Sequence, residues 1–446
     1  MRSGKKGSES SSTGRKTERG VLQAGVAKVD ITPHEPTYLC GYSLRKEPAA
    51  DVHDPIFVRA LAFDDGRRRF VMMMADLVGM DGESVRSRIA EATGIDPECV
   101  YAGDVHNHAS PISSARPKNA PPGHLGNDHT RWFKHFHEAV VQVVRDALAT
   151  LQPVKIGAGK GSSRIAMNRR KRMHDRESVI TFDENAASQS FGEHKTDRPV
   201  PIREFEGVVR LGANPAGPID EEVGVLRIDT LDDRSLAVLI NYACHGTSLG
   251  GRNASISGDW MGRMMTVVED RLGVSPIFLQ GAAGDVNPRF VGGLDGYVDS
   301  FEKTAELGEE FASEVIRVWN GIRTESPAAP TIRAASADIL LPRCYRDLYK
   351  DFRNTAVVAP TTAVRIDDLT WVNFPGEMFN EIGREVKRAS PTPVTFLACC
   401  TNGSVGYFPT RSAFGEGGYE PVMSHLDPAA EQHYVRQITE LLGRLR

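Results

Sequence analysis

The stretch ECVYAGDVHNHASP, residues 98–111, joins a predicted buried strand to a polar turn. The apolar run before His106 has the short length and the β-branched and aromatic content of a strand. Two histidines, His106 and His108, then follow with one residue between them. In α/β proteins, functional sites are built at the carboxyl ends of strands, because the strand positions the backbone while the following loop supplies side chains. The stretch therefore favours an α/β fold with functional residues at strand ends.

Outward from this stretch, strand-like and helix-like runs alternate. Strands are predicted at residues 58–65, 68–80, 98–105, 222–230, 235–245, 276–281, 331–342, 363–374 and 394–402. Helices are predicted at residues 84–94, 129–151, 258–273, 300–322, 376–389 and 429–445. Residues 160–220 are polar and turn-rich, so we expect a long excursion from the sheet there. No internal repeat is present, and we predict one large α/β domain of mixed β-sheets with flanking helices over residues 21–446.

The composition argues against several kinds of partner and segment. The 446 residues are 40% hydrophobic and 25% charged, with a formal net charge of -4, so neither nucleic acid nor an anionic membrane is expected as a partner. Residues 1–20 are basic, rich in Ser and Gly, and lack the apolar core of a secretory signal. We expect them to form a disordered leader, and we expect no transmembrane segment in the chain. The location is expected to be cytoplasmic or is left unknown by the sequence. The six cysteines form no CxxC pair and are expected to be mostly buried and reduced. The oligomeric state is not set by the sequence.

Several predicted strands end in side chains that bind metals or move protons. These are His106, His108, His245, Asp285, Asn287, Glu377 and Tyr407. In an extended backbone, residues i and i+2 point to the same side, so the imidazoles of His106 and His108 can approach one centre. Two histidines and a glutamate are ligands that zinc takes in catalytic sites, although iron or manganese would also accept them.

Each of these residues also has a purely structural interpretation. A histidine at a strand end is often a hydrogen-bonded core residue, and Tyr407 could be a half-buried aromatic. Glu377 follows Pro-Gly and would be a favourable carboxylate in the first turn of the predicted helix at 376–389. Two other metal-hydrolase motifs are absent, because the chain has no HExxH and no Asp-His shortly after its HxH.

Nine short motifs follow one another along residues 23–422. They are KVDITP (28–33), CGY (40–42), HDPIFVRALAFDDG (53–66), HNHASP (106–111), NYACHGTSL (241–249), SGDWMG (257–262), LQGAAGDVNP (279–288), PGEMF (375–379) and GYFPT with GYE (406–410 and 418–420). In this order the sequence resembles the catalytic domain of the neutral, non-lysosomal ceramidases. The resemblance implies that family's catalytic-domain fold and amide hydrolysis with one zinc ion.

The resemblance also implies a set of site residues. The implied zinc ligands are His106, His245, Glu377 and Tyr407. The implied catalytic residues are His108 as acid or base, with Arg169, Asn287 and Tyr419 stabilising the oxyanion. Zinc lowers the pKa of a bound water from about 16 to about 7, so no protein nucleophile is required. Asp259 and Asp285 are expected to orient ligands or loop backbone rather than to bind the metal.

Three features depart from the family pattern. Asn287 stands in GDVNP where ceramidases carry a serine needed for activity. The C-terminal immunoglobulin-like domain of ceramidases is not expected after the GYE region. The family is usually secreted or membrane-associated, whereas no export signal is visible here. These departures put ceramide itself in doubt as the substrate.

We therefore expect a zinc-dependent hydrolase that cleaves the amide (N-acyl) bond of a small molecule or lipid. Cleavage of an ester, a lactone or a glycoside is one alternative, and a catalytically inactive sugar- or lipid-binding homologue, suggested by Asn287, is another. A basic cluster is either a solvated face or a rim that binds an anionic or polyhydroxylated substrate. It consists of Arg169, Arg170, Lys171, Arg172 and Arg176.

Overall fold

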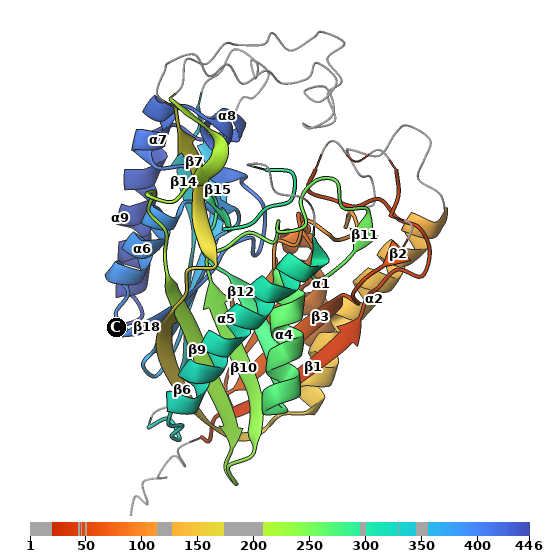
Figure 1. Cartoon of the computed structure of the whole chain (residues 1–446). Helices are drawn as coiled ribbons and strands as arrows, with labels where there is room; N and C mark the ends of the chain where they lie inside the picture. The colour runs from red at the N-terminus through yellow and green to blue at the C-terminus, as the bar shows by residue number, and fades with distance from the viewer. Residues whose placement is uncertain are drawn as a thin grey trace, which may run out of the picture.

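The computed structural model describes residues 20–42, 45, 47–49, 51–113, 127–173, 208–294, 300–328, 330–344 and 356–446, with side chains of the helix at 127–149 described from residue 131. Its two largest β-sheets pack against each other, and helices cover them (Figure 1). The expected α/β fold with mixed sheets and flanking helices is confirmed. The leader predicted over residues 1–20 lies, apart from Gly20, outside the described residues.

The first sheet has eight strands in the order β12-β10-β9-β6-β1-β3-β4-β5. They are β1 (Gln23–Asp30), β3 (Phe57–Asp64), β4 (Arg69–Ala75), β5 (Val100–Asp104), β6 (Gln152–Ser162), β9 (Glu222–Thr230), β10 (Ser235–Tyr242) and β12 (Ser275–Gln280). Neighbouring strands are antiparallel except for the two outer pairs, β10 with β12 and β4 with β5, which are parallel. The segments that follow β5, β10 and β12 carry predicted site residues.

The second sheet has the order β14-β15-β16-β18. Its strands are β14 (Ile332–Pro342), β15 (Ala356–Ile366), β16 (Leu369–Asn373) and β18 (Val394–Ala398). Three small sheets complete the strand structure. They are β13 (Val286–Pro288) with β7 (Ala166–Arg172) and β8 (Val209–Asn214), β17 (Glu377–Met378) with β19 (Tyr407–Phe408), and β2 (Asp51–Val52) with β11 (Ser255–Ile256).

The helices pack on both sheets (Figure 1). They are α1 (Gly82–Thr93), α2 (Asn127–Ala149), α4 (Asp259–Leu272), α5 (Phe301–Gly321), α6 (Asn380–Ala389), α7 (Arg411–Glu416), α8 (Tyr419–Met423), α9 (Ala430–Gly443) and the 3-10 helix η1 (Pro97–Cys99). Helix α2 contacts β1 and β3, α5 contacts β6 and β9, and α9 contacts β14. Within the described ranges, no helix is both long enough and apolar enough to cross a membrane.

Strand β4 shows why its sequence, RFVMMMA, is apolar at nearly every position. Phe70 and Met72 lie in the core between the two sheets, where Phe70 meets Trp371 edge to face at 5.6 Å between ring centroids. Val71 and Met73 point the other way, into the core shared with α1 and α2. Because successive strand residues face opposite sides, a strand buried on both faces must be apolar throughout.

Three sequence predictions need correction. The helix predicted at 376–389 begins only at Asn380, because Glu377–Met378 forms the short strand β17. The predicted excursion at 160–220 contains strands β7 and β8, while residues 174–207 lie outside the described residues. The strand predicted at 363–374 is a hairpin of β15 and β16, which turns at Asp367 with a φ of 52°.

Candidate metal and catalytic site

His106 follows β5 in a left-handed backbone conformation, with a φ of 63°. Asp104 Oδ1 accepts a hydrogen bond from the His106 backbone N–H at 3.0 Å and so supports this turn. The expectation of an extended HxH backbone is therefore wrong. The turn nevertheless brings the ring centroids of His106 and His108 to 5.0 Å from each other.

The His108 ring packs directly on the CGY segment. A Cβ at Gly41 would lie only 2.4 Å from His108 Nδ1, and Gly41 has a φ of +94°, so only glycine fits there. Tyr42 meets the same ring edge to face at 5.2 Å between centroids. The close packing explains why a glycine precedes Tyr42 in this motif.

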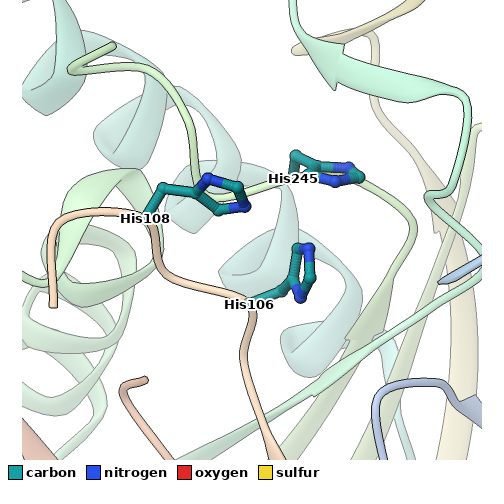
Figure 2. Close-up of side chains that lie close together, drawn as sticks. All are labelled: His106, His108 and His245. Atoms are coloured by element: carbon teal, nitrogen blue, oxygen red, sulfur yellow. The ribbon is translucent and has the colours of Figure 1, made fainter. Parts of the chain in front are cut away.

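His245 follows β10 and lies 1% exposed beside the two other histidines. Figure 2 shows the imidazoles of His106, His108 and His245 lying close together. The His245 centroid is 4.6 Å from that of His106 and 5.7 Å from that of His108. One ring nitrogen from each histidine lies within 4.8 Å of the other two, which is close enough for a shared metal ion.

Glu377 reaches this histidine cluster from β17. Its Oε2 lies 3.1 Å from His245 Nε2 and 3.3 Å from His106 Nε2. Burial alone would raise the pKa of Glu377, but His106 and His245 outweigh burial and hold it well below its usual value. Glu377 is therefore a carboxylate directed at two imidazoles.

The hydrogen bonds of His245 determine which of its ring nitrogens carries the proton. The other nitrogen has a lone pair, and it is the one that faces Glu377. Its Nδ1 lies 3.0 Å from the carbonyl oxygen of Val286, which can only accept, so Nδ1 is the donor. In a neutral imidazole, Nε2 then carries a lone pair. Two lone pairs, on His245 Nε2 and Glu377 Oε2, face each other at 3.1 Å, and such a contact is favourable only with a cation or proton between them.

The other ring nitrogens of the cluster support the same interpretation. His106 Nε2 and both nitrogens of His108 are buried without a hydrogen-bond partner in the described part of the chain. Such orphaned groups are costly unless something binds them. Imidazole nitrogens with a carboxylate oxygen are a donor set that zinc accepts, so the residues present fit a zinc ion.

Tyr407 lies beside Glu377, because β19 pairs in parallel with β17 and sets these two residues opposite each other. Arg169 Cζ lies 5.4 Å from the Tyr407 ring centroid and the guanidinium hydrogen-bonds the phenol. Burial and the negative charge of Glu377 raise the pKa of Tyr407 well above its usual value. The ring of Tyr419 follows at 5.5 Å between centroids.

Arg169 extends from β7 into the site and is 6% exposed. Its Nη1 lies 3.2 Å from His245 Nε2 and donates to Asn287 Oδ1 at 3.3 Å, while Nη2 donates to the Gly284 carbonyl at 2.8 Å. Thr247 Oγ1 also donates to Asn287 Oδ1, at 3.4 Å. The amide oxygen of Asn287 is thus occupied, and its NH2 is the group that it can offer to a substrate.

Glu420 is a buried member of the site that sequence reasoning missed. Its two oxygens accept from Arg169 Nε at 2.8 Å and from Arg170 Nη1 at 2.9 Å, and its side chain is 1% exposed. The only available signal was its position directly after Tyr419 in GYE.

For the basic cluster, Arg169 and Arg170 are therefore buried and paired rather than solvated. Arg172 is exposed and pairs with Glu416, and Arg176 lies outside the described residues.

Asp259 and Asp285 organise the loops around the histidines. Asp259 accepts from the backbone N–H groups of Ser248 and Trp260, close behind His245. Asp285 accepts from the backbone N–H of Asn380 at 2.9 Å and from the amide of Asn168 at 3.0 Å. Burial raises the pKa of Asp285 to about 7.

Comparison with known proteins shows the family of the chain. The family model described as neutral/alkaline non-lysosomal ceramidase, N-terminal, matches residues 22–305. The neutral ceramidase from Pseudomonas aeruginosa has a similar fold, with a TM-score of 0.71 at 17% identity over 96% of this chain and 75% of that chain. A ceramidase complexed with C2 is similar at a TM-score of 0.71 and 18% identity over the same shares. No curated protein matches the sequence. The chain therefore belongs to the neutral/alkaline non-lysosomal ceramidases, enzymes that hydrolyse the N-acyl C–N bond of ceramide.

Proposed function

We propose that the chain is a zinc-dependent hydrolase that cleaves the N-acyl amide bond of a lipid or lipid-like small molecule. The observation that carries this proposal is the convergence of Glu377 Oε2 on His245 Nε2 and His106 Nε2, at 3.1 and 3.3 Å. A lone pair on the imidazole that faces a carboxylate oxygen at this distance needs a proton or a cation between them, and a zinc ion would fill that role. Family membership adds the reaction class.

In this proposal His106, His245, Glu377 and Tyr407 hold the zinc ion. The ion would supply a Lewis acid and lower the pKa of water at the reaction centre to about 7. Arg169 contacts both His245 and Tyr407, so it would position these two ligands.

His108 is proposed to carry the proton to the leaving amine. Burial and the neighbouring His106 and His245 lower the pKa of His108 well below its usual value, so its imidazole is neutral at neutral pH. A neutral imidazole accepts the proton released by the attacking water and passes it to the amine nitrogen. Its two buried, unpartnered nitrogens leave it free to do so.

The oxyanion that develops during attack is proposed to bind Asn287, Arg169 and Tyr419. The Asn287 NH2 and the Arg169 guanidinium are hydrogen-bond donors held in place by neighbouring groups. Donors positioned in this way stabilise negative charge without reorganising during the reaction. The serine that ceramidases carry at this position is therefore not required as a nucleophile in the proposed mechanism.

Family membership supports the proposed substrate class. One similar solved ceramidase is in complex with C2, and we propose an N-acyl substrate with a lipid-like chain for this protein. Ester or lactone cleavage is the runner-up, because activated water attacks those carbonyls too. An inactive binding homologue is less well supported, since the donor groups proposed for metal binding lie together rather than apart.

The test is metal content measured by elemental mass spectrometry on protein purified without added metal. We expect about one zinc per chain in the wild type and in His433→Ala, whose histidine lies on α9 outside the cluster. His106→Ala and Glu377→Ala should lose both the zinc and the hydrolysis of a short-chain ceramide. A wild-type protein that takes up no zinc, even when zinc is supplied, would refute the proposal.

A further inference from the structure

Cys400 touches His106 on the side away from Glu377. Its Sγ lies 3.3 Å from His106 Nδ1, which is hydrogen-bonding distance for sulfur. The Asp104 carboxylate lies farther from His106 Nδ1, at 3.7 Å to its Oδ1. Asp104 is also engaged elsewhere, because its Oδ1 accepts the His106 backbone N–H at 3.0 Å and its Oδ2 accepts the Met80 N–H at 3.0 Å.

The backbone of Cys400 connects the two segments that carry His106 and Glu377. Its N–H donates to the Gly376 carbonyl at 3.1 Å, and its carbonyl accepts from the Asp104 N–H at 3.3 Å. Cys400 has a φ of 53°, a left-handed conformation that a non-glycine residue adopts only when its surroundings hold it there. The sulfur is therefore held at a defined position against the imidazole.

We propose that Cys400 is a positioning residue for His106, an inference that rests on the proposed role of His106 as a metal ligand. The sulfur accepts the Nδ1–H of the imidazole, and this bond orients the ring with its Nε2 lone pair toward Glu377 and His245. Metal-binding histidines are usually oriented in this way by a carboxylate, a backbone carbonyl or water. His245 follows that rule through the Val286 carbonyl, whereas His106 uses a thiol.

A different role for Cys400 is direct metal binding. Asp104, His106 and Cys400 each offer a ligand atom, and these atoms lie within 4.8 Å of one another. In that case the ion would take the Nδ1 side of His106. Cys400 would then be a ligand rather than a positioning residue, and the experiment must separate the two roles.

The experiment compares Cys400→Ala and Cys400→Ser with Cys399→Ala. Cys399 is the adjacent buried cysteine, and its alanine variant is the matched control. Alanine retains the Cβ, so the strain of the left-handed backbone at Cys400 is unchanged. Zinc affinity is measured by competition with a chelator, and thermal unfolding verifies that each variant folds.

We expect zinc to bind about 10- to 100-fold more weakly to Cys400→Ala. Cys400→Ser, whose hydroxyl can still accept the Nδ1–H, should recover part of that loss, and Cys399→Ala should bind as the wild type does. Equal zinc affinity in Cys400→Ala and the wild type would overturn the proposal. An intense thiolate-to-cobalt band in the cobalt-substituted wild type, absent in Cys400→Ala, would also overturn it, because Cys400 would then be a ligand.

A second readout needs no metal. Crystal structures of the zinc-free wild type and variants should show one orientation of the His106 ring in the wild type and in Cys399→Ala. The ring should be rotated or occupy two orientations in Cys400→Ala. If the wild type bound no zinc, the proposed function would fail while this comparison still tested Cys400. An unchanged ring in Cys400→Ala would contradict the positioning role.

Discussion

Asn287 shows how a single residue can change the chemistry offered to a substrate. Its Oδ1 accepts from Arg169 and Thr247, at 3.3 and 3.4 Å. These two contacts set the orientation of the amide, because the opposite orientation would place NH2 against the Arg169 guanidinium. The side chain therefore offers a donor where ceramidases carry a serine hydroxyl.

Asn287→Asp tests this donor. The carboxylate keeps the contact with Arg169 but has no N–H, so kcat should fall by about 10²- to 10³-fold, the usual cost of one oxyanion donor. Asn287→Ser restores a hydroxyl donor and should lose less activity. Steady-state kinetics with a short-chain ceramide, at matched zinc content, gives the comparison. If Asn287→Asp retained the wild-type kcat, the amide would have no role as a donor.

At the residue scale, sequence reasoning identified the histidines but gave the wrong geometry for them. His106 is left-handed rather than extended, because contacts with Asp104 and the Cys400 segment outweigh the local preference. Glu420 and Cys400 were not identified as neighbours of the site. Their roles depend on partners 251 and 294 residues away in the sequence, which no local pattern specifies.

At the scale of elements, the short pairing of β17 with β19 matters more than its length suggests. Sequence periodicity placed Glu377 in a helix, but its N–H donates to the Gly406 carbonyl at 3.0 Å instead. This bond keeps residues 377–378 extended and sets Glu377 opposite Tyr407. A two-residue strand has too few positions to produce a periodic pattern, so the sequence could not predict it.

Helix α6, which follows β17, is tied to the first sheet by a charged cluster. Lys387 Nζ lies 2.8 Å from Asp220 Oδ2 and 3.0 Å from Glu222 Oε1. Burial disfavours the charged forms of Lys387 and Glu222, but their neighbours of opposite charge outweigh this effect. They raise the pKa of Lys387 and lower that of Glu222, for which Lys160 also contributes. The cluster therefore stabilises the fold in its charged form.

Lys387→Met should destabilise the protein by about 1–3 kcal/mol near neutral pH, because two carboxylates lose their shared donor. The contribution of Glu222 is present above its unfolded pKa of about 4.3 and is lost as pH falls through its lower folded pKa. The contribution of Lys387 is present below about 10.4 and is lost as pH rises through its higher folded pKa. Thermal unfolding measured from about pH 2 to about pH 12 should show the difference between variant and wild type shrinking at both ends, below about pH 4.3 and above about pH 10.4.

Lys134→Met, on an exposed pair with Glu138 in α2, is the control for that measurement. Exposed pairs contribute little to stability, so it should unfold close to the wild-type temperature at every pH. A difference between Lys387→Met and wild type that stayed constant with pH would contradict the assignment to these ionised groups.

At the scale of the whole molecule, the proposed metal site joins segments that are far apart in the chain. His106 follows β5, His245 follows β10, and Glu377 and Tyr407 lie on β17 and β19. A ligand that binds only the folded state stabilises it by about 2.7 kcal/mol at a concentration of 100 times Kd. Metal bound at this junction should therefore hold the fold together.

Removing the metal with a chelator should lower Tm by several degrees, and added zinc should restore it. Differential scanning calorimetry of the zinc-loaded and chelator-treated protein measures the shift. In Glu377→Ala, zinc should have little effect on Tm. A zinc-dependent increase of the same size in that variant would mean that the stabilising metal binds elsewhere.

The α/β class, most strand and helix positions, and the polar residues at strand ends could all be predicted from the sequence. These properties follow from short-range periodicity, which each segment carries within itself. Other contacts are visible only in the folded chain: Glu377 faces His106 and His245, Arg169 is buried against Glu420, and Cys400 touches His106. These contacts depend on how distant segments pack against one another. Such packing involves many side chains at once, so no single segment of the sequence specifies it.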